Sequence, residues 1–581
     1  MCGIVASIGE TDQVDNVVAG LKKLEYRGYD SSGIAFLKQG KICAIKSVGT
    51  IENLQKKIMD TKANIVIGHT RWATHGAVSE DNAHPHLSFD KKITIVHNGI
   101  IENHKEIKKA FLSEIDQKSQ TDSEIFANLI AIQEKSSIKK LIFASQKTKG
   151  SFAVAMLCEG EKAIYLAKRN SPLYVACDEK FAMAASDISV FAGKFHQFYI
   201  MENDEFAVMK RGKIEFFDSQ AKHIEKQSHQ MCDFQLDEEN FDEKYFMLKE
   251  INEQSFVLKK TYFEYFSANV LSEDIVEQLK KFSMVYFVAC GTAYHSTLIA
   301  TEFFQKYVGV ICKNQIASEF RYSKEKIVKN CLYVFVSQSG ETADTIECAK
   351  KVKQMGGKVL CVTNVPYSTL NTIADYVVPT FAGRECAVAS TKAYTAQVFT
   401  LLILAIKLSK TDLMQEAKNF VMNYHLELRD NLLHKEILKF KKVFFMGRGQ
   451  DYATSLEAAL KLKEIAYINC LGIAAGELKH GTLALVDENT LVVAISTQEK
   501  MKEKLENNIE EVKARGGKVL LVSSFNHFVD VDFHLHLAGF DECFMPIVSI
   551  IPLQKLAFDC AVALGHNPDK PRNLAKSVTV E

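Results

Sequence analysis

One stretch of sequence occurs twice in this chain, and it constrains the fold more than any other feature. Gly-Gly-Lys-Val-Leu stands at 356–360 and again at 516–520, each time after a predicted helix and at the start of an apolar strand. Two further pairs of segments match at nearly the same offset: 333–336 with 492–495, and 285–291 with 443–449. Strands that alternate with amphipathic helices predict parallel sheets flanked by helices. Residues 265–565 are therefore predicted to hold two copies of one α/β unit.

The two copies differ in the turn that follows the matching strand. In the first copy this turn contains hydroxyl residues and a glycine: Ser337, Gln338, Ser339, Gly340, Glu341 and Thr342. Such a turn, leading into a helix, offers backbone amides and the positive end of the helix dipole to a phosphate group. The second copy lacks the glycine and carries Glu499, whose carboxylate would repel an anion. We expect phosphate binding in the first copy only, with an ordinary helix cap as the alternative.

Length and charge limit the classes of partner. A chain of 581 residues is too long for one core and predicts roughly three or four domains. Lys plus Arg and Asp plus Glu are equal at 71 each, so nucleic acid and membrane surfaces are not expected partners. No stretch approaches about 18 uninterrupted apolar residues, which predicts a cytoplasmic protein. The 14 cysteines show no CxxC spacing and indicate buried thiols, not a disulfide framework or a zinc site.

The chain divides by composition. Residues 2–230 contain short strands and a few helices separated by glycine and polar turns, which predicts an α+β layered domain. An acidic, less periodic stretch follows, and 231–264 is predicted to be a linker. The remaining predicted boundaries are 265–425 for the first α/β copy, 426–565 for the second, and 566–581 for a C-terminal tail.

Cys2 is the residue that points to chemistry in the first domain. If Met1 is removed, the thiol lies beside its own free amine, whose reference pKa of about 8 leaves part of it uncharged near neutrality. One residue then supplies both a nucleophile and a base. Taken alone, a near-terminal cysteine without a role is equally compatible with the sequence.

Four polar segments occur in the strand-rich context of the same domain, at 26–33, 69–76, 97–99 and 121–122. Together with Cys2 they resemble the glutaminase domain of the amino-terminal-nucleophile amidotransferases, whose fold is a layered αββα arrangement. The resemblance implies that Cys2 attacks the side-chain amide of glutamine, which gives a thioester and ammonia.

The same resemblance assigns roles to the polar residues. Asn98 and the amide of Gly99 would form an oxyanion hole, which needs donors aimed at the developing charge. Arg71 would bind the α-carboxylate of glutamine through a two-pronged pair, and Asp122 its α-amine. The other positions implied at the glutamine site are Arg27, which would support the cysteine, and Trp72, His75 and Gly76. Trp72, the only tryptophan, also resembles the gate of a dry ammonia passage, with a core tryptophan as the alternative.

The second half resembles the sugar isomerase (SIS) fold. Its polar motifs lie at 290–292, 337–342, 388–392, 461–464, 476–481 and 572–577. In this order, the whole set resembles the amidotransferases that convert fructose 6-phosphate to glucosamine 6-phosphate, the first step of hexosamine synthesis, and the resemblance covers essentially the whole chain. The implied sugar-phosphate ligands are Thr292, Ser337, Gln338, Ser339, Thr342, Val388, Ser390 and Ala575.

The reaction implied by this resemblance needs an acid/base, an amine and a carboxylate. Glu457, Lys461 and Glu464 are spaced four and three residues apart on a predicted helix, so they share one face. Glu464 matches the proton carrier between the first two sugar carbons, and Lys461 is placed to keep it ionised. His480 matches a ring-opening histidine that the family contributes across a dimer interface. Lys576 matches the lysine that forms a Schiff base with the open-chain ketose.

The implied partners are L-glutamine, D-fructose 6-phosphate and a second copy of the chain in a homodimer, with no cofactor and no metal. The tail, with Pro568 and Pro571, is predicted to be extended and to lie across other elements. Ala293 and Thr482 depart from the serine and proline common in the family, which predicts at most an altered affinity for the sugar.

Two other functions fit parts of the sequence. An amidotransferase acting on a phosphoribosyl pyrophosphate would need an acidic diphosphate-binding strand and loop, which the sequence lacks. A non-catalytic sugar-phosphate sensor built on the isomerase fold predicts the loss of Glu464, His480 or Lys576, and all three are present.

Overall fold

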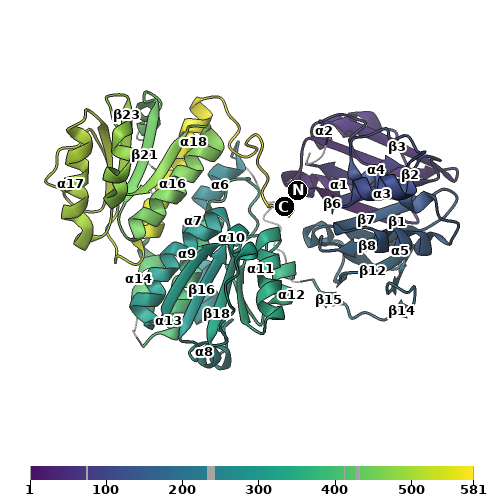
Figure 1. Ribbon diagram of the computed structural model, residues 1–581, viewed down its shortest axis with the longest axis horizontal. Helices are drawn as coiled ribbons and strands as arrows, with labels where there is room; N and C mark the ends of the chain where they lie inside the picture. The colour runs from purple at the N-terminus through teal and green to yellow at the C-terminus, as the bar shows by residue number, and fades with distance from the viewer. Residues whose placement is uncertain are drawn as a thin grey trace. The chain divides into compact units, whose positions relative to one another are not determined.

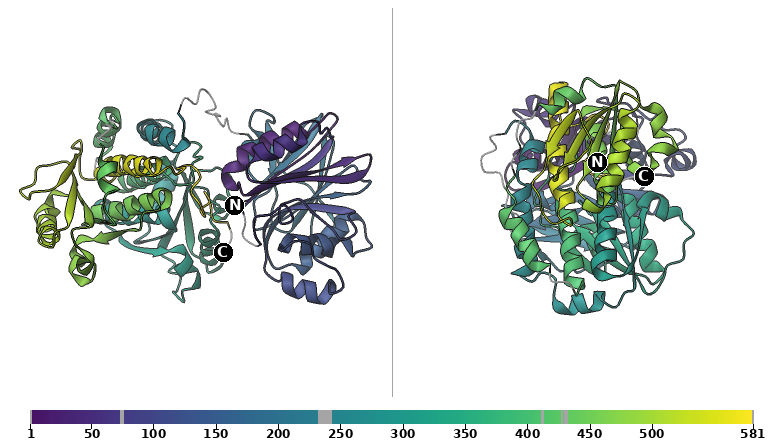
Figure 2. Two further views of the ribbon diagram at one scale, coloured as in Figure 1. Left: turned by 90° about the horizontal axis from the view of Figure 1, so that it is seen from above. Right: turned by 90° about the vertical axis from the view of Figure 1, so that its left-hand side faces the viewer.

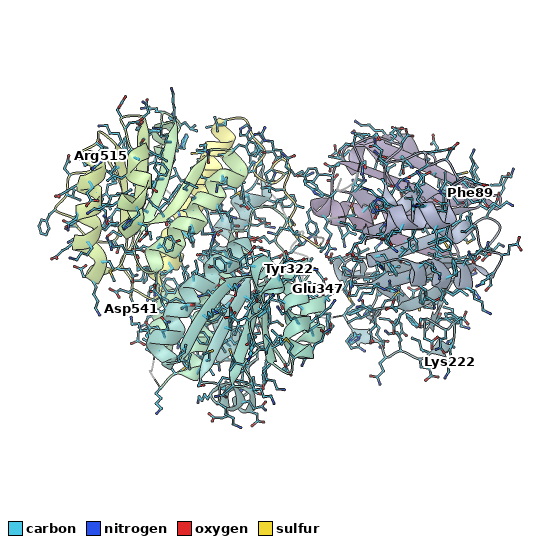
Figure 3. The ribbon with its side chains drawn as sticks, in the orientation of Figure 1. Phe89, Lys222, Tyr322, Glu347, Arg515 and Asp541 are labelled. Atoms are coloured by element: carbon cyan, nitrogen blue, oxygen red, sulfur yellow. The ribbon has the colours of Figure 1, made fainter. Side chains whose placement is uncertain are left out.

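The structure is a computed structural model that describes residues 2–72, 76–231, 243–410, 413–426, 428 and 432–579 (Figure 1). The chain divides into two compact units, one within residues 1–239 together with 577–581, and one within 240–576. Side chains fill the space between the layers of each unit, whereas labelled residues such as Phe89 and Arg515 lie on the outside (Figure 3).

The first unit contains two antiparallel sheets. In spatial order the eight-stranded sheet consists of β15 (His229–Gln230), β11 (Gln197–Ile200), β9 (Tyr174–Cys177), β10 (Phe181–Ala185), β1 (Gly3–Gly9), β4 (Ile65–Arg71), β2 (Ser31–Lys38) and β3 (Lys41–Val48). The seven-stranded sheet consists of β14 (His223–Ile224), β13 (Lys213–Phe217), β12 (Glu205–Lys210), β8 (Ile164–Arg169), β7 (Gly150–Cys158), β6 (Ile93–Ile101) and β5 (His86–Leu87).

The helices of this unit cover the outer faces of the sheets (Figure 2). They are α1 (Val14–Leu24), α2 (Ile51–Ile58), α3 (His104–Phe111), α4 (Asp122–Ala131) and α5 (Ser137–Lys147). Helix α1 packs on β1 and β4, while α4 packs on β6 and α5 on β8. Between the sheets, apolar side chains such as Ile4, Val96 and Leu166 form one core. Strand β1 is buried along its whole length because both of its faces are covered. These layers confirm the predicted αββα fold.

The second unit contains two parallel five-stranded sheets. The first is ordered β17 (Ile311–Ile316), β16 (Met284–Ala289), β18 (Cys331–Ser337), β19 (Lys358–Thr363) and β20 (Tyr376–Pro379). The second is ordered β22 (Cys470–Ala474), β21 (Lys442–Gly447), β23 (Thr490–Ser496), β24 (Lys518–Ser523) and β25 (Phe533–His536). Because the two sheets share one strand order, the sequence repeat corresponds to a repeat of structure.

Helices flank both sheets (Figure 1). They are α8 (Glu273–Leu279), α9 (Gly291–Phe303), α10 (Ala317–Tyr322), α11 (Ala343–Gln354), α12 (Thr369–Ile373), α13 (Lys392–Leu408), α14 (Met414–Asn423), α15 (Leu433–Ile437), α16 (Gln450–Ala466), α17 (Lys502–Lys513) and α18 (Met545–Ala563). Helix α9 packs on α13 and α16, and α16 packs on α18. One hydrophobic core runs through both copies. Helix α18 is long and apolar enough to cross a membrane, but 78% of it is buried as a core helix.

The repeated glycine pair has a structural cause in both copies. Gly356 and Gly516 follow α11 and α17 with φ of +79° and +83°, the left-handed conformation that ends a helix. A Cβ on Gly357 or Gly517 would lie within 2.8 Å of a valine side chain. The pair is therefore needed where each helix turns back into its strand.

The segment predicted as a linker is largely helical. Residues 232–242 lie outside the described part, but α6 (Phe246–Asn252) and α7 (Gln254–Phe266) occupy most of the remainder. Met247, Ile251 and Leu258 are fully buried in the core of the second unit, against which the two helices pack. The acidic residues near 240 obscured this apolar pattern, and only the stretch before 246 remains as a connection.

The tail is held against the second unit. The Asp569 carboxylate accepts hydrogen bonds from the backbone N–H groups of Phe246 (2.9 Å) and Met247 (2.8 Å). The Asp569 carbonyl accepts a 3.1 Å bond from the N–H of Val388. Further along, the Arg572 guanidinium lies 4.3 Å from the ring centroid of Tyr467. These contacts bring the tail to the 385–392 turn.

Candidate active sites

Cys2 lies at the start of β1 and contacts the backbone at the end of β4. Its Sγ accepts a hydrogen bond from the N–H of Trp72 at 3.3 Å and lies 3.6 Å from the Trp72 carbonyl. Burial raises the pKa of the Cys2 thiol, while the positive charge of Arg71 opposes the shift. Deprotonation of this thiol therefore needs a base, which fits the predicted use of the amino-terminal amine.

Asn98 lies on β6 with its side chain held at both ends. Its Nδ2 donates to the Cys2 carbonyl at 3.1 Å. The Nε2 atom of His69 lies 3.0 Å from both the Asn98 Oδ1 and the His97 carbonyl. Two acceptors at one ring nitrogen require that Nε2 of His69 carries the proton. His69 thus fixes the orientation of the Asn98 amide, with its N–H groups toward Cys2.

Gly99 follows Asn98 with φ of +120°. A Cβ at this position would lie 2.1 Å from the Ser151 carbonyl oxygen, so only glycine fits. This close approach to β7 fixes the backbone directly after Asn98, whose side chain contacts Cys2.

A group of buried histidines lies behind Asn98. The rings of His69 and His84 stack at 4.0 Å, and that of His86 meets His84 edge-on at 4.5 Å. Burial lowers the pKa of His69 to about 3 and that of His84 and His86 well below the usual range, so these rings are neutral. The sequence analysis assigned them no role. The available signal was the density of histidines within and between two short strand patterns, where His69, His84, His86 and His97 occur together with His75.

The predicted glutamine ligands Arg71 and Asp122 lie close enough to each other, and Arg71 to Cys2, for their charges to interact. Arg71 is buried at the end of β4, and its guanidinium lies 3.4 Å from the carbonyl oxygens of Gly76 and Ala77. Burial lowers the pKa of Arg71, whereas Cys2, Asp30 and Asp122 raise it. Asp122 begins α4, and its carboxylate accepts a 2.7 Å bond from the N–H of Ile101.

Three other predicted positions remain. The Trp72 ring packs edge-on against that of Tyr29 at 5.5 Å, and His75 lies outside the described residues. Arg27 forms a buried ion pair with Asp187 at 2.6 Å and donates to the Ser186 carbonyl. Because the Ser186 hydroxyl binds the N–H of Ile4 on β1, Arg27 supports the strand that carries Cys2.

In the second unit, the turn between β18 and α11 is closed by its own hydroxyl groups. The N–H of Gly340 donates to the Ser337 hydroxyl at 3.1 Å, and that of Glu341 to the Ser339 hydroxyl at 3.1 Å. Ser337 also bonds the Thr342 hydroxyl at 3.0 Å. Gly340 has φ of +66°, and a Cβ there would overlap a neighbouring serine side chain. The turn is preformed, with hydroxyl groups grouped at the start of a helix.

At the equivalent turn of the second copy, which follows β23, a buried carboxylate from helix α16 binds the backbone instead. Asp451 accepts hydrogen bonds from the N–H of Thr497 at 2.7 Å and from the Thr497 hydroxyl. Burial raises the pKa of Asp451 to about 7, with Thr497 opposing and Glu302 adding to the shift. An internal carboxyl group occupies the place that an anion would need. This supports the prediction of phosphate binding in the first copy only.

Helix α16 brings Glu457, Lys461 and Glu464 together. The Lys461 ammonium is fully enclosed, 2.6 Å from the Glu464 carboxylate and 3.4 Å from that of Glu457. Burial alone would lower the pKa of Lys461, but the two carboxylates raise it. The Thr292 hydroxyl bridges Lys461 and Glu457 at 3.1 Å from each. His295 Nδ1 lies 2.7 Å from Glu457 Oε2, and the sequence analysis did not single it out.

Lys576, from the tail, reaches the turn before α13. Its Nζ pairs with the Glu385 carboxylate and lies 3.2 Å from the Ser390 hydroxyl. The charge of Glu385 is among those that raise the pKa of Lys461 on α16, so the Lys576 pair and the α16 groups interact electrostatically. His480 is exposed on a short helical turn at 475–480, and no hydrogen bond or ion pair joins it to the other described residues.

Comparisons with known proteins find related domains in both halves of the chain. A glutamine amidotransferase domain model matches residues 69–193, and a SIS domain model matches 278–407 and 436–561. The C-terminal domain of glucosamine-fructose-6-phosphate aminotransferase from Francisella tularensis is 36% identical, with a TM-score of 0.52, over 57% of this chain and 99% of that domain. The chain is therefore an enzyme of the class that joins a glutamine amidotransferase domain to two SIS domains.

Full-length relatives narrow the assignment. Glutamine–fructose-6-phosphate aminotransferase (isomerizing) of Clostridium acetobutylicum is 39% identical over 609 residues, and that of Bacillus anthracis is 40% identical over 604 residues. Each comparison covers 100% of both chains. This chain belongs to the family of isomerizing glutamine–fructose-6-phosphate aminotransferases.

Proposed function

We propose that this enzyme hydrolyses glutamine to glutamate and ammonia, and uses that ammonia to convert fructose 6-phosphate to glucosamine 6-phosphate. The observation that carries the proposal is the presence of two sites in one chain. One is a partly buried thiol beside an oriented amide, and the other combines a buried lysine held between two carboxylates with a preformed hydroxyl turn in the same unit. The full-length similarity to aminotransferases of this name supports it.

In the first unit, the amino-terminal amine takes the proton of Cys2, and the thiolate attacks the side-chain amide carbon of glutamine. The oxyanion that develops is stabilised by Asn98 Nδ2 and the Gly99 amide. Collapse of this intermediate expels ammonia and leaves a thioester, which water hydrolyses to glutamate. Arg71 and Asp122 bind the α-carboxylate and α-amine. Trp72 is proposed to gate the transfer of ammonia.

In the second unit, the hydroxyl turn at 337–342 and the residues Thr292, Val388, Ser390 and Ala575 bind the sugar phosphate. His480 opens the ring, and its exposure here is consistent with service to the site of a second subunit in a homodimer. Lys576 condenses with the open-chain ketone and water leaves. Ammonia then attacks the imine carbon and displaces the Lys576 amine, which leaves the new nitrogen on that carbon. Glu464, paired with Lys461, moves the proton between the first two carbons.

The proposal includes a glutaminase domain at 2–230, a division between the two SIS domains at 425–426, an end of the second SIS domain at 565, and a cytoplasmic location. Its chemical part rests on one further condition, the removal of Met1. Without that step, Cys2 has no free amine of its own.

The test is to incubate the full-length protein with glutamine and fructose 6-phosphate and to measure glutamate and glucosamine 6-phosphate. Equal amounts of both products are expected. Cys2→Ala should abolish both when glutamine is the nitrogen source, while Glu464→Gln should still release glutamate but form no amino sugar. Mass spectrometry of the amino terminus checks the removal of Met1.

Each other outcome points to a different conclusion. Glutamate without amino sugar from the wild-type protein would indicate another amidotransferase, and neither product would indicate a sugar-phosphate sensor. Glutamine use by Cys2→Ala would refute the assignment of the nucleophile.

A further inference from the structure

A cluster of buried charged side chains surrounds Lys576. The ammonium of Lys576 and the carboxylate of Glu385, which form an ion pair, are 1% and 0% exposed. Glu250 on α6 is also buried and lies beside Glu385. At the edge of the cluster, Lys392 pairs with Glu253 at 2.6 Å. Three carboxyl groups thus face two ammonium groups, and burying an unbalanced charge is costly.

Glu250 resolves this imbalance by holding a proton. Burial raises the pKa of Glu250 to about 8, and the charge of Glu385 adds to the shift. One carboxyl oxygen of Glu250 accepts hydrogen bonds from the N–H groups of Cys386 (2.5 Å) and Ala387 (3.2 Å). The other has no partner among the described residues. Burial and the neighbouring charge of Glu385 thus favour the protonated form of Glu250 at neutral pH.

Glu385, in contrast, is kept ionised. Burial would raise its pKa, but Lys576 and two backbone amides lower it. Those amides, Thr391 N–H at 2.9 Å and Ala393 N–H at 3.0 Å, belong to the start of α13. A carboxylate fixed at a helix N-terminus and held against Nζ is a preorganised proton acceptor.

The Lys576 ammonium lies where it can transfer a proton directly to that carboxylate. Its Nζ contacts Glu385 and the Ser390 hydroxyl, so two of its three N–H bonds have acceptors. An ammonium has no lone pair and cannot attack a carbonyl carbon, so Schiff-base formation requires that one proton leave first. Among the described residues, Glu385 is the ionised group in direct contact with that nitrogen.

We propose that Glu385 is the catalytic base that activates Lys576, an inference that rests on the proposed Schiff-base role of Lys576. Glu385 accepts a proton from the Lys576 ammonium, and the free amine forms a C–N bond to the ketone carbon of the open-chain sugar. After the carbinolamine forms, Glu385 returns the proton to its hydroxyl group. The C–O bond then breaks, water leaves, and the imine nitrogen retains the positive charge beside the regenerated carboxylate.

The test uses the full-length Glu385→Gln variant with fructose 6-phosphate and sodium cyanoborohydride, without glutamine. The measured quantity is the rate at which the reduced sugar adduct appears on the Lys576 peptide, by mass spectrometry. At pH 7 we expect a fall of about 10²- to 10⁴-fold, the usual contribution of a general base. The rate should recover as the pH approaches about 10, where lysine loses its proton unaided.

Two controls separate base chemistry from loss of structure. Glu253→Gln makes the same chemical change on a neighbouring residue that contacts Lys392 and not Lys576. In this variant the reduced sugar adduct should form on Lys576 at the wild-type rate. Glu385→Asp keeps a carboxylate and should trap faster than Glu385→Gln at pH 7. Binding of fructose 6-phosphate should change less than threefold in Glu385→Gln, which reports an intact site.

The charged groups that face Glu385 and Lys576 are Glu250, Lys392 and Lys461, with Arg384 and Cys386 in the adjoining turn. Removing the charge of Glu385 also removes one cause of the raised pKa of Glu250, so the recovery at high pH is assigned to Lys576 where it persists in the Glu250→Gln, Glu385→Gln double variant. Trapping by Glu385→Gln at the wild-type rate at pH 7, or none at any pH, would overturn the proposal. Absence of an adduct on Lys576 in the wild-type protein would instead refute the proposed Schiff-base role.

Discussion

Asp451 allows a quantitative test of the idea that a buried carboxyl group occupies the turn of the second copy where an anion would otherwise bind. Its carboxyl group is 2% exposed and is bound to the N–H and hydroxyl of Thr497. Asp451→Asn preserves the shape of the side chain and one acceptor for the Thr497 N–H, but cannot ionise. The pH-dependent part of the effect of this variant is therefore the cost of placing a charge at this point.

The size of that cost follows from the pKa. Burial raises the pKa of Asp451 from 3.8 to about 7. Because the folded-state pKa is the higher one, the native protein binds the extra proton, and stability falls as pH rises from the unfolded value to the folded value. The fall is about 1.4 kcal/mol per pH unit, or about 4 kcal/mol in total.

Thermal unfolding of wild-type and Asp451→Asn proteins between pH 5 and pH 8 measures the effect. The advantage of the variant should grow by about 3 kcal/mol over this range, since part of the change already lies below pH 5. For a unit the size of residues 240–576, this is about 4 °C in the midpoint of its transition. Loss of one hydrogen bond from the Thr497 hydroxyl adds an offset that does not vary with pH.

A midpoint difference that stays constant from pH 5 to pH 8 would refute this account of Asp451. Glu302, the nearby carboxyl group with a pKa that burial also raises, contributes a change of the same sign when Asp451 is neutralised. The first unit provides an internal control, because its own transition should not respond to the substitution.

Two further predictions concern the groups that hold the reacting residues. His69→Leu removes the donor that orients Asn98. It should lower kcat for glutamine hydrolysis about 10²-fold with little change in KM, because the oxyanion exists only in the transition state. His69→Gln retains a donor and should recover part of the rate, whereas a change confined to KM in steady-state kinetics would contradict the assignment. Lys461→Met leaves the enclosed Glu457 carboxylate without its ammonium partner. Calorimetry should show that the second unit is destabilised by about 3–5 kcal/mol. An unchanged unfolding midpoint would contradict the ion-pair interpretation.

Features that depend on neighbouring residues were predictable from the sequence. The spacing of Lys461 and Glu464 places them on one helical face, and the structure brings their charged atoms to 2.6 Å. The repeated glycine pair predicted two α/β copies because ending a helix and closely approaching a valine both require glycine. The linker prediction was wrong over α6 and α7, where burial against the second unit outweighs the acidic composition.

Features that join distant segments needed the folded structure. His69 and Asn98 come from different strands, His295 meets Glu457 across 162 residues, and Lys576 meets Glu385 across 191. No periodicity relates such positions, because their contact depends on which strand ends and helix starts the fold places together. For the same reason, the motif at 337–342 predicted an anion site in one copy, but the sequence did not reveal a buried carboxylate in the other.

The amino-acid sequence alone therefore determined the kinds of layer, the repeat, and the residue types able to carry amide hydrolysis and sugar isomerisation, since these follow from local spacing and side-chain chemistry. The tertiary structure decided which of those groups are buried, paired and oriented. Burial and pairing set the charge of Glu250, Glu385, Lys461 and Asp451, and they arise only when segments far apart in the chain exclude water together.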